Sequence, residues 1–110
     1  MMHELGITRR IVAIVSEHAG SARVRRVSLD IGRLCAINPD AIRFCFDVCC
    51  KDTMLEGADL VINVIPGIAR CEVCGNEFPI NQPFGQCHCG SRHIHCVAGE
   101  EMNITEMEVY

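Results

Sequence analysis

The feature that most constrains this chain is a cysteine-rich segment in its C-terminal half. Residues 68–96 combine cysteines with glycines and prolines, and they contain too few apolar side chains to form a core of their own. A segment of this kind needs a cross-link or a bound metal to become ordered. Two close cysteine pairs supply the donors, Cys71 with Cys74 and Cys87 with Cys89. We therefore predict that the segment folds around one metal ion held by four thiolates.

The first cysteine pair has the spacing of a zinc knuckle, and the second pair departs from it. In Cys71-Glu72-Val73-Cys74-Gly75 the two-residue gap lets both thiolates face one ion, and the glycine permits a tight turn. A single residue separates Cys87 from Cys89, whereas a zinc ribbon repeats the two-residue gap. The sequence therefore leaves the local geometry of the second loop open.

The four cysteines predict a structural zinc ion rather than a catalytic one. Thiolates favour Zn(II), and four of them close a tetrahedron that has no open position for chemistry. The alternatives are reduced thiols without a metal, a redox-active pair, or an iron–sulfur cluster. The short second gap also leaves the fourth ligand open. The residues close enough in sequence to compete for the ion are His88, His93, His95 and Cys96.

Composition and charge exclude several classes of protein. No apolar run approaches the roughly 20 residues that cross a bilayer, and the N-terminus lacks the residue order of a signal peptide. The net charge of −4 offers no basic face for nucleic acid. We therefore predict a cytoplasmic location and reduced cysteines. Four cysteines lie in apolar sequence that is typical of small buried side chains: Cys35, Cys45, Cys49 and Cys50.

Outside the cysteine-rich segment, hydrophobic periodicity predicts both helices and strands. Residues 4–19 place Ile7, Ile11, Ile14 and Val15 at helical spacing. Residues 27–31 alternate as a half-buried strand should, and residues 60–65 are β-branched. The tail, residues 104–110, is strand-like again.

A second helix is predicted to begin at Pro39. Asn38-Pro39-Asp40 has the order of an N-cap, a first helical position and an acidic first turn. The apolar residues that follow on one side of this helix are Ala41, Phe44, Cys45 and Val48.

Together these elements predict an α+β fold. We expect two helices on a small sheet of about three strands, with a zinc-ribbon-like module inserted before the last strand. The predicted α/β domain covers residues 1–67 and 103–110, and the predicted zinc-binding domain covers residues 68–102. Because the last strand follows the inserted module, exchange of that strand between two chains could form a homodimer.

The N-terminus is a second place where residue order suggests metal chemistry. The terminal amine of Met1, the amides of Met2 and His3, and the His3 ring can together form a planar set of nitrogen donors. Planar nitrogen sites suit Ni(II) or Cu(II) better than Zn(II). If translation starts at Met2 instead, one donor must come from Glu4 or from elsewhere.

Motifs along nearly the whole chain also occur in a specific order. His-Glu-Leu opens the first helix, Ile-Gly-Arg-Leu follows the first strand, and Pro-Asp-Ala-Ile-Arg-Phe opens the second helix. Leu-Glu-Gly-Ala precedes a strand that ends in Pro-Gly, and the cysteine pairs and a closing Glu-Met-x-Ile-x-x-Met-Glu-Val follow. In this order the chain resembles the HypA/HybF family of hydrogenase-maturation nickel chaperones.

The resemblance implies a protein that binds Ni(II) through His3, with Glu4 its neighbour in the site. It implies structural Zn(II) on four cysteines: Cys71, Cys74, Cys87 and Cys89. It also implies delivery of nickel, together with a GTPase partner of the HypB type, to the large subunit of [NiFe] hydrogenase or, in some relatives, to the urease system. The family starts Met-His-Glu, so the extra residue before His3 makes the full nickel ligand set depend on the true first residue.

Two other classes of function are compatible with parts of the sequence. A zinc-ribbon module could recruit protein partners without any metal transfer. A thiol oxidoreductase would need a cysteine pair at a helix N-terminus, but Cys71 and Cys74 are followed by glycine and turn residues. Neither an open zinc site nor a carboxylate pair with a clear role is present in the sequence. We therefore predict that the chain is not an enzyme.

Overall fold

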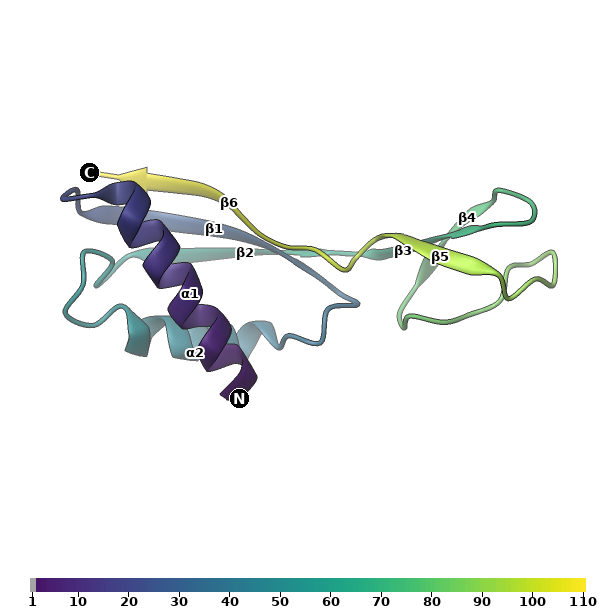
Figure 1. The fold of residues 1–110 in the computed structure, drawn as a ribbon, viewed down its shortest axis with the longest axis horizontal. Helices are drawn as coiled ribbons and strands as arrows, with labels where there is room; N and C mark the ends of the chain where they lie inside the picture. Colours follow the sequence, from purple (N-terminus) through teal and green to yellow (C-terminus); the bar gives the residue numbers. More distant parts are fainter. Residues whose placement is uncertain (1) are drawn as a thin grey trace. The chain divides into compact units, whose positions relative to one another are not determined.

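The computed structural model describes residues 2–110, so Met1 and the predicted amine ligand lie outside the described residues. The described elements, in chain order, are α1 (Met2–Ala19), β1 (Val24–Gly32), α2 (Pro39–Cys49), β2 (Asp59–Ile65), β3 (Gly67–Cys71), β4 (Glu77–Ile80), β5 (Ile94–Ala98) and β6 (Met102–Val109) (Figure 1). The strands form two three-stranded sheets, with the orders β2-β1-β6 and β4-β3-β5. The predicted fold class, two helices and a small sheet with an inserted cysteine-rich module, is confirmed.

The chain divides into two compact units. Unit 1 contains the chain up to Leu29 together with Ile37–Asn63 and Asn103–Tyr110, and unit 2 contains Asp30–Ala36 and Val64–Met102. The end of β1 and the turn after it therefore belong with the cysteine-rich segment. The narrower zinc-binding domain, residues 68–102, stays a prediction.

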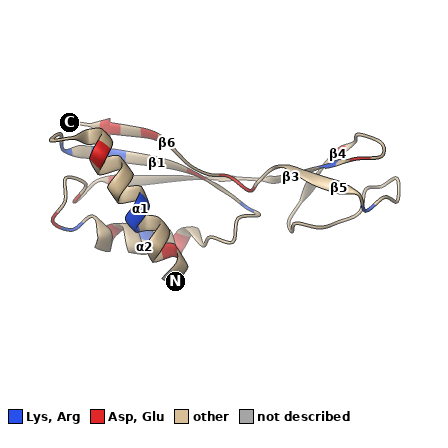
Figure 2. Cartoon of the chain, viewed as in Figure 1, with Lys and Arg blue, Asp and Glu red and all other residues tan. Residues whose placement is uncertain are grey.

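Both helices of unit 1 carry acidic as well as basic residues. Acidic and basic residues are interspersed along α1 and along α2 (Figure 2). Among residues 2–110, no helix is both long enough and apolar enough to span a membrane.

The buried side of α1 differs from the predicted apolar stripe. The residues that α1 buries include Glu4, Thr8, Ile11 and Val15, which lie four, three and four positions apart. Ile14, predicted to lie on the stripe, is 39% exposed. The stripe thus continues toward the N-terminus through two polar residues. The Thr8 hydroxyl donates to the Glu4 carbonyl at 2.6 Å, so its burial leaves no polar group unsatisfied.

The predicted start of α2 is confirmed. Asn38 has an extended backbone, and its side-chain oxygen accepts hydrogen bonds from the N–H groups of Asp40 at 2.9 Å and Ala41 at 3.4 Å. Pro39 occupies the start of the helix, where its missing N–H costs no hydrogen bond.

The buried side of α2 shares only Cys45 with the side expected from the sequence. Ile42, Cys45 and Phe46 are buried, whereas Phe44 and Val48 are 60% and 56% exposed. This helix carries apolar residues on two sides, so periodicity alone did not decide which side would face the core.

Unit 2 has a thin core. β3 pairs antiparallel with both β4 and β5, and the ladder to β4 runs from Gly67 opposite Ile80 to Arg70 opposite Glu77. The side chains of Arg70 and Glu77 form an ion pair across this ladder. Residues of unit 2 whose apolar side chains are buried are Ile31, Ala69, Cys71, Ile80 and Cys87. Two of these five are cysteines, as expected for a module that depends on a metal.

Candidate metal centre

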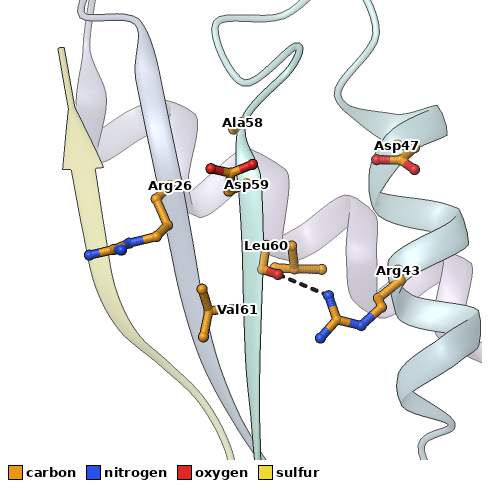
Figure 3. A pocket seen from close by; sticks show the side chains of 7 residues that line it. All are labelled: Arg26, Arg43, Asp47, Ala58, Asp59, Leu60 and Val61. Atoms are coloured by element: carbon orange, nitrogen blue, oxygen red, sulfur yellow. Dashed lines mark hydrogen bonds between the residues drawn. The ribbon is translucent and has the colours of Figure 1, made fainter.

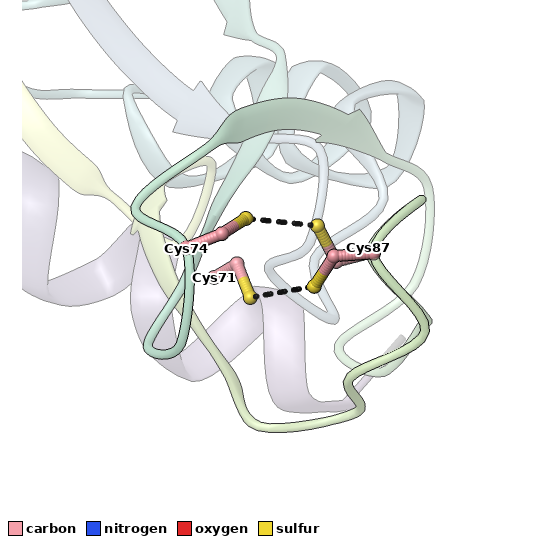
Figure 4. A group of neighbouring side chains, drawn as sticks. Cys71, Cys74 and Cys87 are labelled. Carbon is pink, nitrogen blue, oxygen red and sulfur yellow. Dashed lines mark hydrogen bonds between the residues drawn. The ribbon is translucent and has the colours of Figure 1, made fainter.

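Four cysteine sulfurs of unit 2 converge on one point. The Sγ atoms of Cys71, Cys74, Cys87 and Cys89 all lie within 4.8 Å of one another. The sulfurs of Cys74 and Cys87 are 3.5 Å apart (Figure 4). The sulfurs of Cys71 and Cys89 are 3.7 Å apart. Sulfurs on a tetrahedral ion with bonds of about 2.3 Å lie about 3.8 Å from one another. None of the four is in a disulfide, so the group has the geometry and the chemistry of a four-thiolate metal site.

The first loop is held by two main-chain hydrogen bonds. The Cys71 N–H donates to the Asn76 carbonyl, and the Gly75 N–H donates to the Cys71 carbonyl, both at 2.9 Å. Gly75 has a φ of +78°, a conformation that glycine adopts without steric cost. These bonds turn Cys74 back toward Cys71.

The second loop repeats this pattern with one residue fewer. The Cys87 N–H donates to the Ser91 carbonyl at 2.9 Å, and the Gly90 N–H donates to the Cys87 carbonyl at 2.8 Å. Gly90 has a φ of +97°. The hydrogen bond from the glycine N–H to the cysteine carbonyl reaches back three residues in this loop and four in the first loop. The shorter Cys87–Cys89 gap is therefore accommodated by a tighter turn.

The four thiols cannot all ionise easily in the absence of a cation. The N–H of Cys74 donates to the Cys71 sulfur and lowers the pKa of Cys71 to about 6. The Asn76 N–H lowers the pKa of Cys74, but the Cys87 sulfur, burial and the other two sulfurs outweigh it and raise that pKa to about 12. One thiolate forms readily, and further negative charge at the same point is resisted. A bound cation would remove that repulsion, since metal ligands bind as thiolates.

The predicted competitors for the fourth position lie outside the cluster. The Cys96 thiol donates to the Ala98 carbonyl at 2.9 Å. His95 lies 3.5 Å from the Glu72 carboxylate, and the exposed His93 is not among the grouped donors. His88 Nδ1 is 3.8 Å from the Cys87 sulfur. Within residues 2–110, the four cysteines alone form a group of three or more metal donors.

His3 and Glu4 lie on the first turn of α1 but face different surroundings. His3 is exposed, whereas Glu4 is buried and accepts a hydrogen bond from the Asn38 N–H at 3.2 Å. This bond is the main reason that the pKa of Glu4 is lowered. Sequence reasoning placed Asn38 at the start of α2 but missed its contact with Glu4. The only signal for that contact was the spacing of Glu4, Thr8 and Ile11, which continues the buried stripe.

A hollow lies beside β2 in unit 1 (Figure 3). The Arg43 guanidinium donates to the Leu60 carbonyl at 2.9 Å, and Arg26 forms an ion pair with Glu108. Both cations in the hollow are therefore engaged. The residues that line it are Arg26, Arg43, Asp47, Ala58, Asp59, Leu60 and Val61.

Comparison with known proteins gives the four-cysteine centre a context. Residues 2–109 match the family described as hydrogenase/urease nickel incorporation, metallochaperone, hypA. The hydrogenase maturation factor HypA of Trichormus variabilis is 59% identical over 108 residues, which cover 98% of this chain and 96% of that protein. The chain belongs to the HypA family. The resemblance noted in the sequence is thereby confirmed.

Other relatives in the HypA family are more distant in sequence. The hydrogenase maturation factor HypA of Geobacter metallireducens is 48% identical over 109 residues, covering 98% of this chain and 99% of that protein. A solution structure of HypA protein matches with a TM-score of 0.74 and 25% identity, over 100% of this chain and 98% of that one. The solution structure of the nickel metallochaperone HypA from Helicobacter pylori has a TM-score of 0.66 at 23% identity, over 96% of each chain, and therefore supports the fold alone.

Proposed function

We propose that this HypA-family chain binds Ni(II) at its N-terminus through His3 and delivers it during [NiFe] hydrogenase maturation. Glu4 belongs to the same end of α1, and four cysteines hold a structural Zn(II). The family supports a role in nickel incorporation. The exposure of His3 on the first turn of α1 is the observation that supports this site. An exposed chelate suits a chaperone, because a partner can begin ligand exchange from its open side.

Zinc is the metal that best fits the cysteine centre. The ligands would be Cys71, Cys74, Cys87 and Cys89, whose sulfur spacing matches a tetrahedral ion with thiolate ligands. A closed set of four thiolates leaves no position for substrate, so the ion would supply folding energy rather than chemistry. Nickel, in contrast, is the cargo of the protein.

The partners follow from the nickel-incorporation role of the family. We propose that nickel moves onward with the help of a GTPase of the HypB type to the hydrogenase large subunit, or to a urease system, in the cytoplasm. The chain acts by binding and transfer rather than by catalysis. A homodimer formed by exchange of β6 remains part of this proposal, with sedimentation over a range of concentrations as its test.

Nickel titration of untagged protein with a native N-terminus tests the proposal. We expect wild type to bind one Ni(II) with the weak visible absorption of a planar complex and to contain about one zinc. His3→Ala should lose the nickel and keep the zinc. His18→Ala is the matched control, because His18 is an exposed histidine near the other end of α1.

Two outcomes would count against the N-terminal site. Equal nickel binding by wild type and His3→Ala would place the cargo elsewhere. Absence of nickel binding in both would favour a zinc-ribbon interaction module without metal transfer.

A further inference from the structure

The first turn of α1 is tied to the first turn of α2 through Glu4. Glu4 is 7% exposed, and its Oε2 accepts a hydrogen bond from the main-chain N–H of Asn38 at 3.2 Å. These residues are 34 positions apart in the sequence, so the bond joins two helices rather than two parts of one. An N–H bond to a carboxylate is stronger than one between neutral groups.

The location of Asn38 strengthens this contact. Asn38 is the N-cap of α2, so its N–H precedes the first turn of an 11-residue helix. The positive end of the helix dipole favours a carboxylate at this point. Meanwhile the Glu4 carbonyl accepts the Thr8 hydroxyl inside α1. Glu4 is thus held through its side chain to α2 and through its main chain to the next turn of α1.

The same contact has a consequence for His3. Adjacent residues of a helix point about 100° apart, so a Glu4 side chain held inward directs the His3 side chain away from α2. His3 is indeed exposed. If Glu4 were released, the first turn would be free to fray, and the imidazole would lose its fixed direction.

We infer that the main-chain N–H of Asn38 is a positioning group for the nickel end of α1, which holds Glu4 against α2 and so presents His3 to the metal. Glu4 acts here as a positioning residue and not as a nickel ligand. The inference rests on the proposed nickel site at His3 and adds the part of the fold that orients it.

Two substitutions at one position separate the N–H from the capping side chain. Asn38→Ala removes the side-chain oxygen that caps α2 and keeps the N–H. Asn38→Pro removes both, at a φ of −84° and ψ of 116° that lie close to the range of proline before another proline. We expect Asn38→Pro to bind nickel about tenfold more weakly than Asn38→Ala, as the loss of a hydrogen bond to a charged group predicts.

A pair at Glu4 gives an independent measurement. Glu4→Gln retains a side-chain oxygen that accepts the Asn38 N–H, whereas Glu4→Met has a similar length and no such acceptor. If Glu4 positions the first turn, Glu4→Gln should bind nickel about as tightly as wild type, and Glu4→Met should bind it about tenfold more weakly. The visible nickel band at saturation should be the same in all four variants, because their donor atoms are unchanged.

The outcomes distinguish this inference from the proposed function. If Asn38→Pro and Asn38→Ala bind nickel equally well while His3→Ala binds none, the positioning role is overturned and the proposed nickel site stands. If Glu4→Gln binds nickel weakly and its visible nickel band is shifted, the positioning role is overturned and Glu4 is a nickel ligand. Nickel binding that is independent of His3 overturns both proposals.

Discussion

At the scale of single residues, the first turn of α1 shows how one side chain can have two possible roles. A glutamate beside the proposed nickel ligand is an obvious candidate donor from sequence. In the structure its carboxylate is buried and bonded to the N-cap of α2. A carboxylate held in this way stabilises the fold as long as it is ionised.

The lowered pKa of Glu4 predicts a pH-dependent contribution to stability. The Asn38 N–H favours the ionised form, so the contribution is complete above the unfolded pKa of about 4.3 and is lost as pH falls through the lower folded pKa. In nickel-free protein, wild type should therefore be more stable than Glu4→Gln at pH 7. The difference should shrink on acidification below about pH 4.3. Urea unfolding of both proteins at several pH values measures it, and a difference that does not change with pH would contradict the prediction.

At the scale of elements, the sequence predicts well which helices and strands exist. It predicts less well which side of each helix is buried. The Asn38 cap, the start of α2 at Pro39 and the strands on both sides of the cysteine-rich segment can all be read from local residue order. The buried sides of the two helices cannot, because α2 is apolar on two sides and α1 buries Thr8 and Glu4. Tertiary contacts decide between such faces, and a single sequence does not contain them explicitly.

In the candidate site too, the sequence predicts part of the structure: the ligands, but not the geometry of the two cysteine loops. The four donors follow from residue type and spacing. The reason that a one-residue gap serves as well as a two-residue gap lies in a glycine hydrogen bond, from Gly90 to Cys87, that is one residue shorter. Because this hydrogen bond joins main-chain groups, which every residue carries, residue types do not predict it, and only the glycine indicates the tighter turn.

Two glycines in different elements should respond oppositely to substitution by alanine. Gly6 lies on the exposed side of α1 and a Cβ there would meet nothing within 4 Å, so Gly6→Ala should stabilise the protein by about 1 kcal/mol. A Cβ on Gly67 would overlap the Ile80 carbonyl oxygen across the β3–β4 ladder. Gly67→Ala should therefore destabilise unit 2 by about 1–3 kcal/mol. Thermal unfolding of metal-loaded protein measures both, and a change of the same sign in the two variants would contradict the argument.

At the scale of the whole molecule, the two units are stabilised by different means. Unit 1 has an aliphatic and aromatic core, in which Leu29, Phe46 and Leu55 are almost completely buried. The core of unit 2 is small, and two of its buried apolar residues are cysteines of the metal centre. A core of this size cannot offset the conformational entropy of the residues of unit 2, Asp30–Ala36 and Val64–Met102, without a further constraint. The two units should therefore respond differently to loss of the metal.

Cys89→Ser is expected to separate these responses in the intact chain. A serine hydroxyl is a poor substitute for a metal-bound thiolate, so the variant should lose the metal of the four-cysteine centre, as wild type should in excess chelator. Amide signals of unit 2, such as those of Ala69 and Ile80, should then lose their native positions, while Phe46 and Leu55 of unit 1 keep theirs. Cys96→Ser is the matched control, because its thiol donates to the Ala98 carbonyl, which a hydroxyl can also do. Metal analysis and two-dimensional NMR of both variants measure the effect. If native unit 2 signals persisted without metal, the β4-β3-β5 sheet would be stable by itself, and the four-cysteine centre would need a role other than folding.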